Sequence, residues 1–155
     1  MVVVEVEYQD EIGVDASPEQ AYALVADVYR SGMHFPSVES LTPLDDGGRW
    51  RWKMKEKGIG PVKIRAAYDA IYTADESART VTWVPPSKGY GDMESSGQWE
   101  IVPDGDKARL RFDARTVAYI PAPRMMSKMV DAFAREELTR LKRQYVAAIA
   151  ATLNS

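Results

Sequence analysis

Hydrophobic and polar residues change period along the chain, and the changes predict three kinds of element. Between residues 49 and 120 they alternate in runs such as RWRWKMKEK, VKIRAAYDAIY, RTVTWV and ARLRFDARTVAY. Such alternation puts one set of side chains on each face of a strand and is typical of half-buried β-strands. Turn residues separate several of the runs, in DESA, PPSKGYG and PDGD, so we expect antiparallel neighbours.

The last part of the chain has a helical period instead. No glycine or proline interrupts residues 124–153, so one helix of about 45 Å is expected at about 1.5 Å per residue. One face of this helix should be apolar, with Met126, Val130, Phe133, Ala134, Leu141, Tyr145 and Ala148. The polar residues expected on or near the other face are Lys128, Arg135, Thr139, Lys142 and Arg143.

The N-terminal part combines a strand with short helices. The run VVVEVEYQDEIGV reads as a strand, and Ser17, Pro18 and Gln20 follow as the N-cap, first helical residue and capping-box partner of a helix. Gly32 and Pro36 then break the next segment into a second short helix or a turn.

The order of elements predicts the fold class. One strand, two short helices, six further strands and a long helix indicate an α+β, helix-grip fold. In it a curved seven-stranded antiparallel sheet holds the C-terminal helix, and the short helices close one end of the groove. The 155 residues, 45% of them apolar, fit a single domain spanning residues 1–155 with one sizeable core.

Charge and rare residues exclude several functions. The net charge of −3 gives no reason to expect a nucleic-acid partner. Without cysteine and with His34 as the only histidine, the chain has no thiolate nucleophile and no Cys- or multi-His metal site, so we expect no metal and no cofactor. The absence of cysteine, of an apolar run of about 20 residues and of a signal-peptide pattern together favours a cytoplasmic location.

Two local patterns occur in an order typical of a known superfamily. V-D-A-S-P-E-Q-A-Y at Val14–Tyr22, G-x-W-x-I-x-P at Gly97–Pro103 and the long terminal helix resemble the START, polyketide cyclase and coenzyme-Q-binding superfamily, which includes the birch-pollen-allergen-like proteins. The resemblance covers nearly the whole chain. It implies a helix-grip fold with an internal apolar cavity, in proteins that bind lipids, sterols, quinones or polyketides. It carries no shared catalytic motif.

Large aromatic residues on the apolar faces of the strands point to the same cavity. A plain core explains any one of them. Together, facing a helix rich in methionine and alanine, they favour an adaptable binding pocket. The residues expected to line it are Trp50, Trp52, Met54, Tyr68, Tyr72, Trp83, Trp99, Phe112, Met126, Val130, Phe133 and Glu137.

Glu137 is unusual because it falls inside the apolar stripe of the helix. A buried carboxylate there is costly unless it is paired or hydrogen-bonded. Either it pairs with an arginine of the sheet or with Arg140, or it is the polar anchor of the cavity and acts on a ligand as an acid or base. Tyr68 and Tyr72 are the other candidates for proton transfer.

One hairpin concentrates positive charge. Its outer face is expected to carry Arg49, Arg51, Lys53, Lys55, Lys57, Lys63 and Arg65. Such a run is usually a solvated surface. The alternative is that it docks on an anionic membrane or an acidic partner, through Arg49, Arg51, Lys53, Lys55, Lys63 and Arg65.

These observations predict that the protein binds a hydrophobic small molecule, such as a lipid, quinone or polyketide, in order to carry or shield it. One alternative is an enzyme of the cyclase or dehydratase type that uses Glu137, Tyr68 or Tyr72. The other is a protein-interaction module with a filled core and no ligand.

Overall fold

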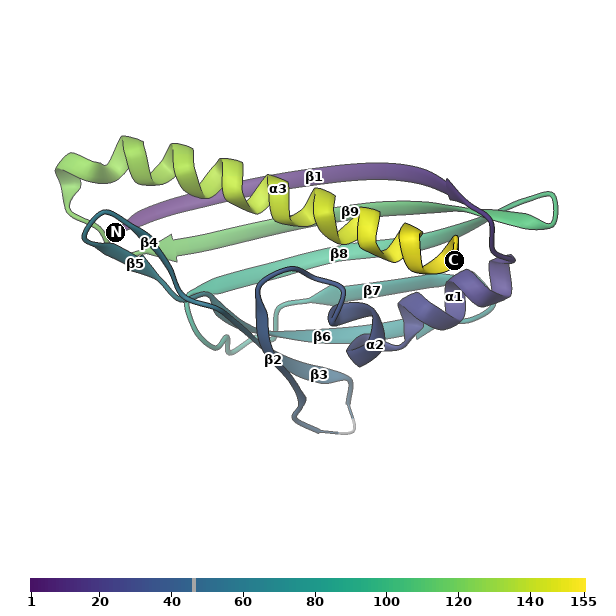
Figure 1. Cartoon of the computed structure of the whole chain (residues 1–155). Coiled ribbons are helices and arrows are strands. Elements are labelled where there is room, and N and C mark those ends of the chain that lie inside the picture. Colours follow the sequence, from purple (N-terminus) through teal and green to yellow (C-terminus); the bar gives the residue numbers. More distant parts are fainter. Residues whose placement is uncertain (46) are drawn as a thin grey trace.

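The computed structural model describes residues 1–45 and 47–155 and confirms the predicted fold class. A seven-stranded antiparallel sheet has the order β1-β9-β8-β7-β6-β3-β2, and the long helix α3 lies across one of its faces (Figure 1). The elements along the chain are β1 (Val2–Val14), α1 (Pro18–Ala26), α2 (Val28–Gly32), β2 (Val38–Pro43), β3 (Arg49–Met54), β4 (Lys57–Ile59), β5 (Val62–Ile64), β6 (Ala67–Asp75), β7 (Thr80–Val84), β8 (Met93–Asp104), β9 (Lys107–Ile120), the 3₁₀ turn η1 (Arg124–Met126) and α3 (Ser127–Leu153).

The predicted capping box begins α1. The Gln20 amide donates to Ser17 Oγ at 3.1 Å, and the Ser17 amide donates to Gln20 Oε1 at 3.0 Å. Two of the orphan amides at the helix start are satisfied in this way. The buried face of α1, with Leu24 and Val25, packs in the main core, so the short helices cover one end of the sheet, as expected.

The G-x-W-x-I-x-P stretch lies in β8, an interior strand of the sheet. A Cβ atom on Gly97 would stand 2.3 Å from the Asp113 carbonyl oxygen and 2.4 Å from the Trp83 ring. Only glycine therefore allows the Trp83 ring to approach this strand so closely. Trp99 and Ile101, two and four residues on, face the core, as strand alternation requires.

The structure differs from the prediction in two strands. Residues 38–41, expected in a broken helix or turn, belong instead to the edge strand β2, which pairs with β3. The strand expected over residues 62–72 is interrupted: β5 pairs with β4 as a separate two-stranded hairpin, and β6 starts at Ala67. The hairpin leaves the sheet because Ile59 and Val62 bury their side chains against α3.

Two hydrophobic clusters hold α3. The larger lies over the centre of the sheet and includes Trp52, Trp99, Phe112 and Tyr145. The smaller joins the first half of α3 to β1, the end of β9 and the β4–β5 hairpin. Figure 1 shows the hairpin beside this first half, whereas α1 and α2 lie beside the C-terminal end of α3. Within the described residues, no helix combines the length and apolarity needed to cross a membrane.

Candidate functional site

A cavity of about 110 Å³ lies between the sheet and α3. Its walls come from the inner faces of β3, β6, β7, β8 and β9, from α2 and the segment after it, from the β4–β5 hairpin and from α3. Nine of the twelve residues that the sequence suggested for a cavity lie in these walls: Trp52, Met54, Tyr68, Tyr72, Trp83, Trp99, Phe112, Phe133 and Glu137.

Aromatic rings cover much of the sheet side. The rings of Trp52 and Tyr68 are stacked, with centroids 5.7 Å apart and planes 7° apart. The ring centroids of Trp99 and Phe112 are 4.6 Å apart. The ring of Tyr145 in α3 contacts Phe112 edge-on, with centroids 5.8 Å apart. Such contacts pack the rings against one another, so this wall is apolar and closely packed.

The polar atoms of these rings are satisfied within the wall. Trp52 Nε1 donates to the Tyr72 hydroxyl at 3.0 Å, and Trp83 Nε1 donates to Ser95 Oγ at 3.1 Å. Burial raises the pKa of Tyr68 and of Tyr72 well above the ordinary value, so both phenols are neutral at pH 7. They can donate a hydrogen bond to a ligand oxygen, but they are unsuited to act as bases.

Trp50, Met126 and Val130 are not among the cavity-lining residues. Trp50 is half-buried near the sheet edge, where it pairs with Pro43 of β2. Met126 ends the 3₁₀ turn before α3, with its methyl group 3.9 Å from the Cβ position of Gly60. Val130 is fully buried in the smaller cluster. Met126 and Val130 do not line the cavity because the chain around the start of α3 packs on β1 and the β4–β5 hairpin, beyond the end of the cavity.

Glu137 lies in the cavity wall beside the β4–β5 hairpin and is paired with two cations. Its carboxylate accepts hydrogen bonds from Lys57 of β4 and from Arg140 one turn along α3. Burial acts to raise the pKa of Glu137, but the hydrogen bonds and charges of Lys57 and Arg140 outweigh it, and the pKa is lowered. Glu137 is therefore ionised at neutral pH, and the ion pair ties the hairpin to α3.

Replacing Glu137 with glutamine is expected to reduce the free energy of unfolding by about 1 kcal/mol at pH 7, because all three side chains retain some contact with water. Since the folded-state pKa is lowered, this stabilisation is present above the unfolded-state pKa of about 4.5 and is lost as the pH falls through the lower folded value. Urea unfolding between pH 3 and 8 measures both effects. The exposed Glu136→Gln is the control, and equal stability of both variants at pH 7 would contradict the expectation.

Lys142 is the functional candidate that the sequence pattern misplaced. It was expected on or near the polar face of α3, yet the residue is only 5% exposed and it lines the cavity. Among the described residues, Lys142 Nζ is the one buried side-chain nitrogen or oxygen without a hydrogen-bond partner. Burial lowers the pKa of Lys142 to about 8. Its spacing from Leu138 (four residues) and Tyr145 (three) is a helical signal that could have revealed it.

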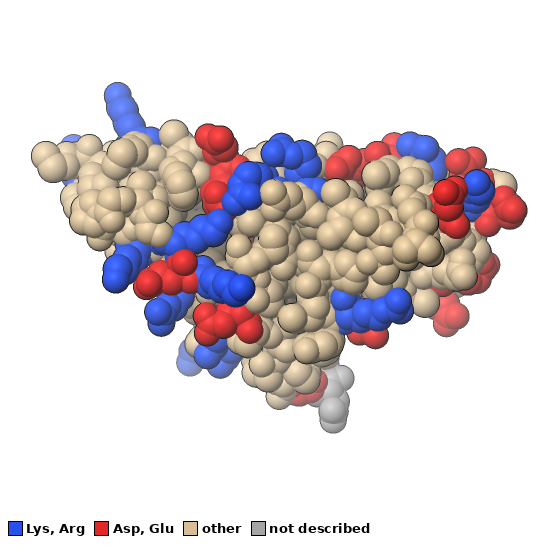
Figure 2. Space-filling model, viewed as in Figure 1, with Lys and Arg blue, Asp and Glu red and all other residues tan. Residues whose placement is uncertain are grey.

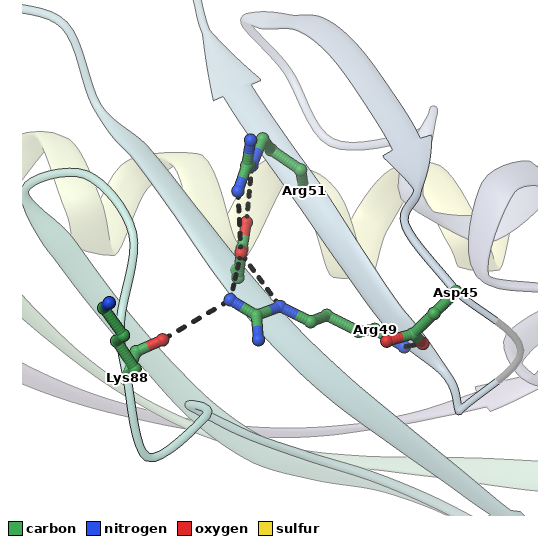
Figure 3. A network of polar contacts seen from close by, with 5 residues as sticks. Asp45, Arg49, Arg51 and Lys88 are labelled. Atoms are coloured by element: carbon green, nitrogen blue, oxygen red, sulfur yellow. Dashed lines mark hydrogen bonds and ion pairs between the residues drawn. The ribbon is translucent and has the colours of Figure 1, made fainter.

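The basic hairpin is held by a buried acid rather than being a free cationic surface. Arg49 and Arg51 converge from β3 (Figure 3) and both bind Asp69 of β6, with Arg49 Nη2 at 2.7 Å and Arg51 Nε at 2.9 Å. The Asp69 side chain has no exposed surface. Lys88 O accepts from Arg49 at 3.4 Å, and the Arg51 guanidinium lies 3.5 Å from the Tyr90 ring centroid.

Two further cations of the expected basic face are also paired. Lys57 binds Glu137, and Arg65 Nη2 lies 3.5 Å from Glu56 Oε1. Lys57 turns toward α3, so the prediction of one common outer face is wrong for this residue. Lys55 borders the cavity but is exposed, as are Lys53 and Lys63. Figure 2 accordingly shows acidic side chains interspersed with basic ones. This pairing reduces the free charge available for docking on an anionic surface.

Comparison with known proteins identifies the family and the fold. The profile of the family described as "Polyketide cyclase / dehydrase and lipid transport" matches residues 4–146. No curated protein matches the sequence at a significant level.

Several solved structures share the fold. The Zhui aromatase/cyclase from Streptomyces sp. R1128 is 18% identical, with a TM-score of 0.66 over 96% of this chain and 93% of that one. A START superfamily protein from Mycobacterium smegmatis is 18% identical, with a TM-score of 0.64 over 95% and 96%. Norcoclaurine synthase from Thalictrum flavum, in complex with dopamine and hydroxybenzaldehyde, is 16% identical, with a TM-score of 0.62 over 97% and 87%.

Proposed function

Because the chain belongs to the polyketide cyclase / dehydrase and lipid transport family, we propose that it binds a hydrophobic small molecule in the cavity between the sheet and α3. The observation that carries the proposal is the cavity itself. Trp52, Trp99 and Phe112 surround a space that a plain core would fill. A protein-interaction module without a ligand does not require this space.

The size of the cavity bears on the ligand. An apolar cavity of about 150 Å³ holds one benzene molecule. At about 110 Å³, the cavity seen here is somewhat smaller, so one ring or a short chain already fills it. The norcoclaurine synthase that shares the fold is in complex with small aromatic molecules, dopamine and hydroxybenzaldehyde. A longer lipid, quinone or polyketide requires the walls to separate. The β4–β5 hairpin is the part of the wall that can move away from α3, since it is not paired with the main sheet.

The test is direct binding of a neutral ring compound, 3-phenylpropanamide, measured by calorimetry and by quenching of the tryptophans in the wall. Ala134→Leu, which adds volume to the α3 wall of the cavity, should weaken binding at least about tenfold. Ala132→Leu, on the exposed side of the same helix, should leave it unchanged. Equal binding of the amide by the Ala134→Leu and Ala132→Leu variants would count against the proposal.

An enzyme of the cyclase or dehydratase type is the second candidate function. The neutral hydroxyls of Tyr68 and Tyr72 favour it, because they can stabilise negative charge that develops on a ligand oxygen. Glu137 is a poorer candidate acid, since Lys57 and Arg140 hold it ionised. Turnover of a poly-β-ketone substrate that falls in Tyr68→Phe and Tyr72→Phe, with ligand binding retained, would distinguish an enzyme from a carrier.

A further inference from the structure

The contacts of Lys142 give no structural reason for burying its amine. Lys142 lies in the cavity wall with Leu138, Leu141 and Tyr145 of α3, and the residue is 5% exposed. Within residues 1–45 and 47–155, no hydrogen-bond partner reaches its Nζ. Structural lysines normally extend the amine to water or pair it with an acid, because an isolated ammonium in an apolar site is costly.

No group around the cavity compensates this charge. The titratable side chains in the walls, besides Lys142, are Lys55, Lys57, Tyr68, Tyr72, Glu137 and Tyr145. The one carboxylate among them, Glu137, is already bound by Lys57 and Arg140. Burial raises the pKa of Tyr145 to about 12, and Tyr68 and Tyr72 are neutral for the same reason. The pKa of Lys142 is lowered by burial alone, to about 8, so most of its amine is still protonated at pH 7.

We propose that Lys142 binds the carboxylate of an amphiphilic ligand whose apolar part occupies the aromatic cavity. The ammonium lacks an anionic oxygen, and a ligand carboxylate supplies one in a site where water competes little. The packed rings of Trp52, Trp99 and Phe112 then contact the ring or chain of the ligand. This inference rests on the proposed function and narrows it: the preferred ligand is a small hydrophobic carboxylic acid rather than a neutral hydrocarbon, ester or alcohol.

The experiment compares two probes of the same shape, 3-phenylpropanoic acid and 3-phenylpropanamide, by calorimetry at pH 7. The wild type is expected to bind the acid about tenfold or more tightly than the amide. Lys142→Met should abolish this preference and change amide affinity by less than about threefold. Lys128→Met, which removes an exposed lysine of the same helix, should keep the preference.

A pH series on the wild type alone makes the same test without a variant. The preference for the acid should fall between pH 7 and 10, because the amine loses its charge while the probe stays ionised. Equal affinity for the two probes in the wild type, or a preference that survives in Lys142→Met, overturns the assignment while leaving the binding function intact. If neither probe binds the wild type, the proposed function fails and this inference fails with it.

Discussion

Replacing Asp69 with asparagine is expected to reduce the free energy of unfolding by about 3 kcal/mol at pH 7, because it leaves two arginines without the buried charge that binds them. Asp69 is fully buried and accepts from both Arg49 and Arg51, at 2.7–3.1 Å. Asparagine preserves the shape, so the loss reports on charge and hydrogen bonds rather than on a cavity. The arginine side chains are about 30% exposed, which lets water recover part of the cost.

The stabilisation by Asp69 is expected to decrease in acid. Burial acts to raise the pKa of Asp69, but the hydrogen bonds and charges of Arg51 and Arg49 dominate and lower it. The stabilisation is therefore present above the unfolded-state pKa of about 3.8 and is lost as the pH falls through the lower folded value. Urea unfolding at pH 7 and pH 3 should show the gap between wild type and Asp69→Asn closing in acid.

The neighbouring pair between Arg65 and Glu56 is the control for Asp69. It bridges the same region, but its side chains are 73% and 39% exposed. Glu56→Gln should change the free energy of unfolding by less than about 0.5 kcal/mol. A loss at Asp69 no larger than the loss at Glu56 would show that burial adds nothing to this ion pair.

Lys142→Met is expected to have an effect of similar size and opposite sign. Burial lowers the pKa of Lys142 from 10.5 to about 8. When the amine is charged in both the folded and the unfolded protein, this difference in pKa corresponds to a free energy of unfolding that is lower by about 3 kcal/mol. Methionine keeps the length of the stem and removes the charge. The variant should therefore be more stable than the wild type by about this amount at pH 7.

The advantage of Lys142→Met should disappear in base. Above pH 8 the folded protein releases the proton of Lys142 while the unfolded chain still holds it, so wild-type stability rises relative to the variant until about pH 10.5. Thermal and urea unfolding from pH 7 to 10.5 measure the trend, and the exposed Lys128→Met should show none. A variant that is less stable at every pH would mean that Lys142 is a structural residue.

A residue in a cavity wall that lowers the stability of the fold often has a function in binding or catalysis. The two experiments on Lys142 are linked, since a carboxylate that pairs with the ammonium should also raise the pKa of the amine. In the presence of 3-phenylpropanoic acid, the stability advantage of Lys142→Met at pH 7 should therefore shrink.

The local features of this fold were predictable because neighbouring residues decide them. Ser17 and Gln20 close their capping box within one turn, and the alternation in β3, β7, β8 and β9 depends on the two faces of each strand. The same alternation explains why nine of the suggested cavity residues do lie around the cavity. Val130 and Met126 were expected on the same helix face as Phe133, but the sequence does not show where α3 begins or where along it the cavity ends.

Partners and burial across the fold were decided only by the tertiary structure. By strand alternation, Asp69 and Arg51 lie on the outer faces of their strands, where the sequence predicts contact with solvent. The β3–β6 register makes them neighbours, and the segment after β7 covers the site through Lys88 and Tyr90. Lys57 turns inward because the β4–β5 hairpin folds onto α3. Lys142 is buried because the sheet and the short helices wrap more of α3 than one apolar stripe. Helical and strand periods specify the direction of a side chain from its own element, but the element that comes to lie opposite determines whether that direction leads to water, to a charge or into a cavity.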